Sequence, residues 1–370
     1  MPEVKLKVRD VYKLMLCLYC IILACRELFQ SMGEAVFIFL ALLFFIPFAV
    51  LAWDFFLNPK FSLGTFLFLL LGSFYVFIYP VNINGLLFFL PMVCAGLAFR
   101  RVEYSFLTKC FLITQIVCLL LRVYLINLGA ITEKELGAEW KVDDGRSVFD
   151  LGYGNSNSAG MTFFFLCCMI YCYGYERKKW LSFVLILAVS YFSYYYTASR
   201  TAFFSSLLLL LAYFIPPKTY MFFKQKWILM LIPLIVAFPL LIVPFSSSIA
   251  FLDQFLSSRI YYMFYMLSLF KSPVSFITGV FVEENNSFPI DNVFSFLLMY
   301  GGLVAIVSWG VFYMAFVRQA KQMPFYIVVL LVVIVLSGVG ESSWATFGRL
   351  GSSFFWLLLL NKTVVPANRN

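Results

Sequence analysis

The chain has 370 residues, of which 63% are hydrophobic and 12% charged, with a net charge of +9 and no histidine. Soluble domains are about half apolar and about a quarter charged, so a water-soluble fold is excluded and a lipid bilayer must surround most of the chain. The missing histidine also excludes Ser-His and Cys-His nucleophile pairs, His-containing metal sites and proton transfer by imidazole.

A membrane-spanning helix needs about 20 mostly apolar residues. In chain order, the apolar runs predict spans near 12–25, 34–53, 61–79, 85–99, 106–128, 156–174, 181–196, 200–215, 227–245, 292–316, 325–340 and 350–361. The first, fourth and last runs are short, so ten to twelve spans are expected. Basic residues precede the first run without a small-residue cleavage site after it, which predicts an uncleaved first span. The predicted fold is all-α, a polytopic membrane bundle formed by residues 1–370 as one domain.

The distribution of basic residues predicts the orientation of this bundle. With the N-terminus in the cytoplasm, 18 of the 27 lysines and arginines fall on the inner side, 12 of them lysine. The positive-inside rule therefore favours an even number of spans with both termini inside. The other nine are mostly arginine, and arginine binds phosphate and carboxylate bidentately. These arginines are Arg26, Arg122, Arg146, Arg200, Arg259 and Arg349.

Two of these arginines have a simpler structural interpretation. Arg26 adjoins Glu27 and is expected to pair with it or to reach the interface. Arg122 lies within an apolar run, where a charge is a functional candidate, but it is also near enough to the outer interface to reach it. Two long outer loops are expected, at 129–155 and 246–290. The first has a net charge of −3, and the second contains an aromatic run suited to the membrane interface.

Four polar clusters each open a helix that is predicted to run from outside to inside. They are GYGNSNSAG at 152–160, ASRT at 198–201, PIDN at 289–292 and FGRLGS at 347–352. Helix N-termini bind anions, and the helix dipole disfavours a cation there by about 0.3–1 kcal/mol. Arg146, Arg200 and Arg349 lie at or just before such ends, so a phosphate-bearing ligand is expected to compensate.

Helix capping alone is an equal alternative for single residues such as Asn292, and Tyr153 also fits an aromatic belt at the interface. The sequence contains no nucleotide-binding motif, and we expect no cofactor, no metal and no nucleic acid. Asp291 and Glu341 are the carboxylates nearest the arginine-bearing ends. Either is a candidate general base.

Three of these stretches resemble the Wzy family of oligosaccharide repeat-unit polymerases, which is related to the O-antigen ligases. The stretch R-x4-LGYGNSNSAGM, from Arg146 to Met161, resembles an Arg followed by LGF-x-x-PN, and only Asn157 is carried over with it. SRTAFFSSLL at 199–208 resembles the Ser-Arg motif of both groups. IDNVFSFLLMYGGLV at 290–304 resembles a later motif in which ligases have His where Asp291 stands, so the identity of the base stays open.

This resemblance implies a GT-C-like membrane transferase in the bacterial cytoplasmic membrane, with its active site facing outward. It would transfer a growing glycan from undecaprenyl pyrophosphate to a fresh lipid-linked repeat, with inversion and without a metal. A chain-length regulator and a flippase of the same pathway would be its partners. The residues assigned to pyrophosphate or glycan binding are Arg146, Arg200, Arg259, Arg349, Asn157, Asn292 and Tyr153, and those assigned to catalysis are Asp291, Glu341 and Arg200.

Two other functions fit the same composition. A flippase or transporter of lipid-linked oligosaccharides would also be a polytopic helical bundle, although transporters often carry charges at the bilayer midplane and internal repeats. An O-antigen-type ligase would share the motifs and differ in its acceptor. The product distinguishes a polymerase from a ligase, because only a polymerase forms a ladder of repeats.

Overall fold

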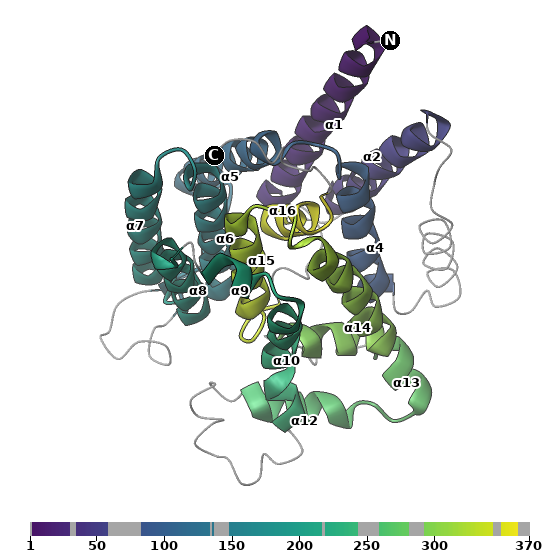
Figure 1. Ribbon diagram of the computed structural model, residues 1–370. Helices are drawn as coiled ribbons and strands as arrows, with labels where there is room; N and C mark the ends of the chain where they lie inside the picture. The colour runs from purple at the N-terminus through teal and green to yellow at the C-terminus, as the bar shows by residue number, and fades with distance from the viewer. Residues whose placement is uncertain are drawn as a thin grey trace.

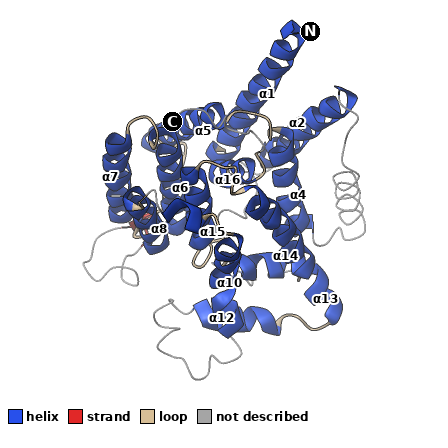
Figure 2. Ribbon diagram, in the orientation of Figure 1, coloured by secondary structure: helices blue, strands red, loops and turns tan. Residues whose placement is uncertain are grey.

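The computed structural model describes residues 2–29, 35–57, 83–133, 135–136, 148–216, 219–242, 259–280, 292–342 and 349–361. This part of the chain is helical nearly throughout (Figures 1 and 2). The strands β1 (Glu135–Leu136) and β2 (Val148–Phe149) pair in antiparallel fashion and form the only sheet among the described residues. The predicted all-α fold is therefore confirmed.

The helices follow one another with short connections wherever both flanks are described. They are α1 (Pro2–Leu28), α2 (Ala35–Leu57), α4 (Ile83–Ala98), α5 (Tyr104–Asn127), α6 (Ser156–Gly174), α7 (Lys179–Thr197), α8 (Arg200–Leu211) with a 3-10 turn (Ala212–Phe214), α9 (Tyr220–Phe223), α10 (Lys226–Ile242), α12 (Arg259–Ser268), α13 (Pro273–Thr278), α14 (Val293–Gln319), α15 (Phe325–Ser337) and α16 (Leu350–Leu359).

Every predicted span coincides with a helix except 61–79, which lies outside the described residues. By length and composition, α5, α7 and α14 can each cross a bilayer. The apolar stretches of α2, α8, α10, α15 and α16 are shorter, at 10–17 residues each. The ten residues of α16 extend about 15 Å, which is half the thickness of the hydrocarbon layer. The chain is thus a helical protein with membrane-spanning segments, and the number of spans stays a prediction.

The shortest of these apolar helices, α16, lies in the interior. Every residue of α16 is buried, and α16 packs against α1, α4, α5 and α15 near the middle of the view in Figure 1. The perimeter helices instead expose large apolar side chains, among them Leu120 on α5, Tyr191 on α7 and Leu234 on α10. Extensive exposed apolar surface marks a membrane-facing perimeter.

Polar contacts join helix termini at one end of the bundle, which we call the Asp54 end. Tyr12, in the third turn of α1, donates a hydrogen bond of 3.1 Å to Asp54, near the end of α2. Asn361, just after α16, donates from its side-chain amide to the carbonyl of Val102, just before α5, at 2.8 Å. The N-terminal half of α1 and the start of α5 therefore lie where α2 and α16 finish.

The opposite termini meet at the other end, which we call the Arg349 end. There the backbone N–H of Leu350, the first residue of α16, donates to the Glu27 carboxylate at the end of α1 (2.8 Å). Arg122, near the end of α5, donates to the Glu27 carbonyl. The helices thus alternate in direction, and which end faces the cytoplasm stays a prediction.

Helix α14 is broken near the Arg349 end. Gly302 has φ 61° and ψ −160°, and the chain leaving α13 packs into the break. The backbone N–H of Val280 donates to the Met299 carbonyl at 2.7 Å, which supplies a partner that the interrupted helix cannot. A Cβ at Gly302 would collide with the Ile277 carbonyl. Only glycine fits this break, because the conformation and the space both exclude a side chain.

Gly302→Ala is predicted to lower the free energy of unfolding by about 1–3 kcal/mol, because it combines a left-handed backbone with a collision against backbone atoms. Gly310→Ala is the matched control in the same helix, where a Cβ meets nothing within 4 Å, and it is expected to be neutral or stabilising by about 0.5–1 kcal/mol. Thermal unfolding in detergent micelles measures both variants. Equal effects would contradict the assigned role of Gly302.

Candidate functional site

The helices α6, α8, α14 and α16 begin close together at the Arg349 end. A Cβ at Gly160 in α6 would collide with Ser199, which precedes α8, and one at Gly340 would lie 2.9 Å from the Thr201 hydroxyl in α8. The first backbone N–H of α14, on Val293, donates to the carbonyl of Gly338 at the end of α15 (2.9 Å).

The start of α16 joins the same group, because a Cβ at Gly351 would collide with the Phe165 ring of α6. The first turns of these helices, where the dipoles are positive, therefore lie near one another. The polar clusters singled out in the sequence are therefore neighbours in space wherever they are described.

Arg122 is a buried arginine whose partners are mainly backbone groups. Its side chain is 1% exposed. One terminal nitrogen donates to the Leu151 carbonyl at 3.1 Å, and the other donates to the Glu27 carbonyl. The guanidinium carbon lies 3.8 Å from the centre of the Tyr153 ring. The positive charge is thus held by carbonyl dipoles and an aromatic face rather than by a carboxylate.

Glu27 connects three helices. Its carboxylate accepts from the Leu350 N–H and from the Cys118 thiol, at 2.8 and 3.8 Å, and its side chain is 2% exposed. The contact with Leu350 caps α16 from a residue 323 positions away in the chain. A carboxylate at a helix N-terminus is favourable, so Glu27 binds where an external anion would also bind.

Two further arginines flank this carboxylate. Arg26 lies close enough to Arg349 for their charges to repel each other, and Glu27 offsets part of this repulsion. Two nitrogens of Arg26 and the Nε of Arg349 are buried, and they have no hydrogen-bond partner among the described residues. Leaving a buried donor unpaired costs about 1–3 kcal/mol. Arg26 and Arg349 therefore keep donors for an anionic ligand, and so does the Nε of Arg122, which likewise has no partner among the described residues.

A small cavity with both polar and apolar walls adjoins these arginines, and it has room for about one water molecule. Its walls are Glu27, Gln115, Ser158, Met161, Thr162, Phe165, Arg349 and Gly351. The Gln115 side chain is 1% exposed, and its amide nitrogen has no partner within the described part of the chain. The cavity therefore presents an amide donor and a guanidinium beside a carboxylate.

The described residues just before α6, from 148 to 155, include three that lie against Arg122. Asp150 is buried, and its carboxylate accepts from the Gly152 N–H at 2.9 Å. Gly152 has φ 69°, and a Cβ there would collide with Ile131 and lie 3.4 Å from the Arg122 guanidinium. The glycine thus lets the loop cross directly over Arg122.

Tyr153 and Glu133 have shifted acidities in this loop. Burial raises the pKa of Tyr153 well above its usual range, the charge of Glu27 adds to the shift, and Arg122 opposes it. The phenol therefore stays protonated and is unsuited to act as a base. Burial and then the charge of Asp150 raise the pKa of Glu133.

The predicted site residues fall in different places. Arg146 and Asp291 lie outside the described residues. So does the Arg259 side chain, although its backbone begins α12. Arg349 lies beside Arg26 and Glu27. Arg200 begins α8 and has an exposed side chain.

The remaining predicted residues lie near helix starts. Glu341 is buried just after α15, beside the turn that touches α8. Asn157 is half-buried in the first turn of α6, where its N–H donates to the Asn155 side chain. Tyr153 covers Arg122.

Asn292 has a complete structural role. Its amide oxygen accepts from the first free N–H groups of α14, on Phe294 and Ser295, at 3.0 and 3.1 Å. Its amide nitrogen donates to the carbonyls of Val236 and Val339. These bonds account for the residue without a ligand.

Sequence reasoning did not select Glu27 or Gln115, and it expected Arg26 to pair with Glu27 or to reach the interface. The Glu27 carboxylate instead binds α16 and Cys118. The sequence showed two adjacent charged residues, Arg26 and Glu27, at the end of an apolar helix, but it did not show that Glu27 would contact α16. No family model, curated protein or solved structure matches the chain.

Gly152→Ala is predicted to destabilise the protein more than Gly154→Ala. Both glycines have positive φ, but a Cβ at Gly154 meets nothing within 4 Å, so the difference isolates the collision with Ile131 above Arg122. Thermal unfolding is expected to show at least about 1 kcal/mol between the variants. Indistinguishable midpoints would contradict this packing.

Glu133→Gln is predicted to change how stability depends on pH. Because the pKa of Glu133 is raised on folding, its stabilising contribution is full below the unfolded-state pKa of about 4.3. That contribution is lost as pH rises through the folded-state pKa. The variant should therefore gain stability relative to wild type as pH rises from about 4 towards neutrality.

Thermal midpoints measured across this pH range test the prediction. Glu176→Gln removes a carboxylate at the exposed turn after α6 and controls for the general effect of one charge. A difference between Glu133→Gln and wild type that does not vary with pH would count against the Glu133–Asp150 interaction.

Proposed function

We propose that the chain is a membrane glycosyltransferase that polymerises undecaprenyl-pyrophosphate-linked oligosaccharide repeat units on the outer face of a bacterial cytoplasmic membrane. The observation that carries this proposal is the meeting of Arg26, Arg122 and Arg349 around Glu27, beside the start of α16. The motif resemblance supplies the class of substrate.

Arg26, Arg122 and Arg349 have different roles in the proposed site. Arg122 binds two backbone carbonyls and the Tyr153 ring, and only its Nε has no partner among the described residues, so its main role is to shape the site. Arg26 and Arg349 retain buried nitrogens without partners among the described residues. Phosphate oxygens are strong acceptors for such donors, and a pyrophosphate would also relieve the repulsion between the two charges.

The proposed reaction needs a leaving group held by positive charge and a base for the acceptor. The acceptor hydroxyl attacks the anomeric carbon of the donor glycan while the bond from that carbon to the pyrophosphate oxygen breaks. Arg26 and Arg349 stabilise the charge that develops on the leaving pyrophosphate. A carboxylate takes the hydroxyl proton, with Glu341 and Asp291 as candidates, and inversion follows from the single displacement.

The apolar perimeter of the protein would hold the lipid part of both substrates. The donor and the acceptor both carry polyprenyl tails, and the exposed apolar side chains of the perimeter helices offer them a continuous nonpolar path. The pyrophosphate then meets the protein at the Arg349 end, at headgroup depth. Arg200, exposed at the start of α8, is placed to contact phosphate or glycan from the same side.

Arg349→Gln and Arg26→Gln are each predicted to lower polymer formation by about a hundredfold or more, the usual cost of losing one donor to a developing negative charge. The assay uses the full chain in proteoliposomes with undecaprenyl-pyrophosphate-linked repeats, and it reads product size and anomeric configuration with and without EDTA. Arg318→Gln is the matched control, since Arg318 is exposed in the last turn of α14.

A ladder of repeats from wild type, unaffected by EDTA, supports the polymerase. Normal ladders from well-folded Arg349→Gln and Arg26→Gln would refute their role. Movement of unpolymerised lipid-linked repeats across the vesicle membrane would identify a flippase instead. Transfer of a preformed glycan to another acceptor, without a ladder, would identify a ligase.

A further inference from the structure

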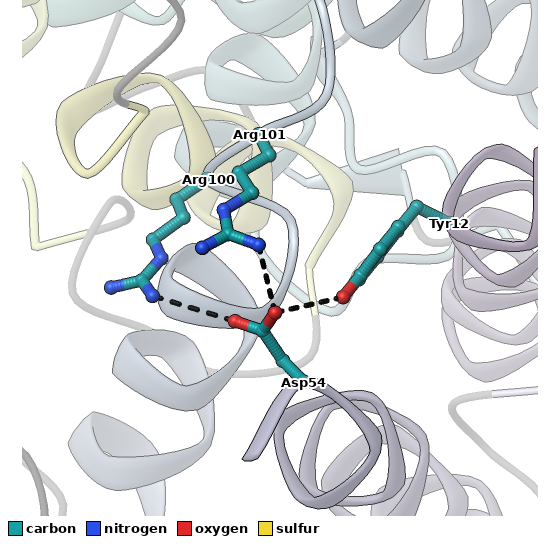
Figure 3. Close-up of polar contacts among 4 residues, drawn as sticks. All are labelled: Tyr12, Asp54, Arg100 and Arg101. Atoms are coloured by element: carbon teal, nitrogen blue, oxygen red, sulfur yellow. Dashed lines mark hydrogen bonds and ion pairs between the residues drawn. The ribbon is translucent and has the colours of Figure 1, made fainter. Parts of the chain in front are cut away.

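A second charged cluster lies at the Asp54 end, remote from the proposed active site. The Asp54 carboxylate is 9% exposed and accepts from Arg101 at 2.8 Å, Tyr12 at 3.1 Å and Arg100 at 3.4 Å. Figure 3 shows both guanidiniums reaching Asp54 from the turn after α4, with Tyr12 approaching from α1. Three segments of the chain thus fix one carboxylate.

The two positive charges of Arg100 and Arg101 exceed the single negative charge of Asp54. A guanidinium carries five N–H donors, and each arginine shows one bond to Asp54. The Arg101 side chain is 52% exposed, and the Arg100 side chain is 22% exposed. The guanidinium N–H groups that do not bind Asp54 are therefore available to a ligand, while Asp54 holds both guanidiniums in place.

The groups around Tyr12 show the same excess. The described charges that act on its hydroxyl are the Asp54 carboxylate and the guanidiniums of Arg100 and Arg101. Two positive charges thus face one negative charge. A preorganised pair of guanidiniums is suited to a phosphate, which it can bind through several N–H groups at once.

The surroundings place this pair at the depth of lipid headgroups. Trp53, next to Asp54, is 51% exposed, and tryptophan is enriched at the membrane interface. On α1, Val11 and Leu14 are exposed, one on either side of Tyr12 in the sequence. An anion bound here would have apolar surface beside it for acyl chains, which a free phosphate does not need.

We propose that Arg100 and Arg101, held by Asp54 and Tyr12, form a binding site for the phosphate of an acidic phospholipid. The lipid belongs to the leaflet that borders the Asp54 end. Its headgroup accepts from the outward N–H groups, and its acyl chains lie against the exposed apolar faces of α1 and α2. Basic pockets between membrane helices bind acidic headgroups by this chemistry.

Native mass spectrometry of the full chain, equilibrated with equal amounts of phosphatidylglycerol and phosphatidylcholine, tests the site. Wild type is expected to retain phosphatidylglycerol selectively. Arg101→Gln should lower the retained phosphatidylglycerol about tenfold, the effect of losing hydrogen bonds to a charged group. Lys178→Gln removes an equal charge from an exposed lysine at the start of α7, and it should change retention less than about twofold.

The double variant Asp54→Asn with Arg101→Gln keeps the net charge and leaves no unpaired buried carboxylate, so it remains informative where Arg101→Gln folds poorly. It should also lose selectivity. Wild-type retention in this double variant, or equal losses in Arg101→Gln and Lys178→Gln, would overturn the proposal. Displacement of the lipid by millimolar inorganic phosphate would assign a free-anion site and overturn it as well.

Discussion

The contact between the Glu27 carboxylate and the first N–H of α16 organises the Arg349 end. It fixes the start of a wholly buried helix to the end of α1, and the carbonyl of the same residue receives Arg122 from α5. Arg122 in turn holds the loop that leads into α6 through the Leu151 carbonyl. One glutamate therefore sets the relative position of helices that are far apart in sequence. Replacing its side chain would leave the start of α16 without its cap, whereas Arg122 would keep its two backbone carbonyl partners.

Much of the fold follows from the sequence because the bilayer imposes a simple rule. Apolar runs must form helices to satisfy their backbone groups in lipid, and the runs ending near residues 128, 174 and 196 match α5, α6 and α7 within a few residues. The break in α14 was not predictable in this way. Its cause is the chain around Ile277, which fills the space beside Gly302, and such a contact leaves no trace in local hydropathy.

The site was predictable only in part, for a similar reason. The polar clusters at helix starts are visible in the sequence, since capping residues and glycines precede apolar runs, and Arg349 was among the residues selected. The partners of Arg349 were not visible. Glu27 lies 323 residues from Leu350 in the sequence. The adjacent Arg26 and Glu27 also suggested a local ion pair, so no distant partner of Glu27 was expected. Asn292 shows the converse, because its bonds to backbone groups match the capping alternative that the sequence offered, and its assignment to a ligand stays a prediction.

The shortness of α16 has a consequence for the depth of its polar attachments. Glu27 at one end and Asn361 at the other are separated by a buried helix about 15 Å long. The hydrocarbon layer of a bilayer is about 30 Å thick. The two attachments therefore cannot both lie at headgroup depth on opposite sides of a membrane. At least one of them places polar side chains below the headgroups, where they are tolerated because they are buried within the bundle.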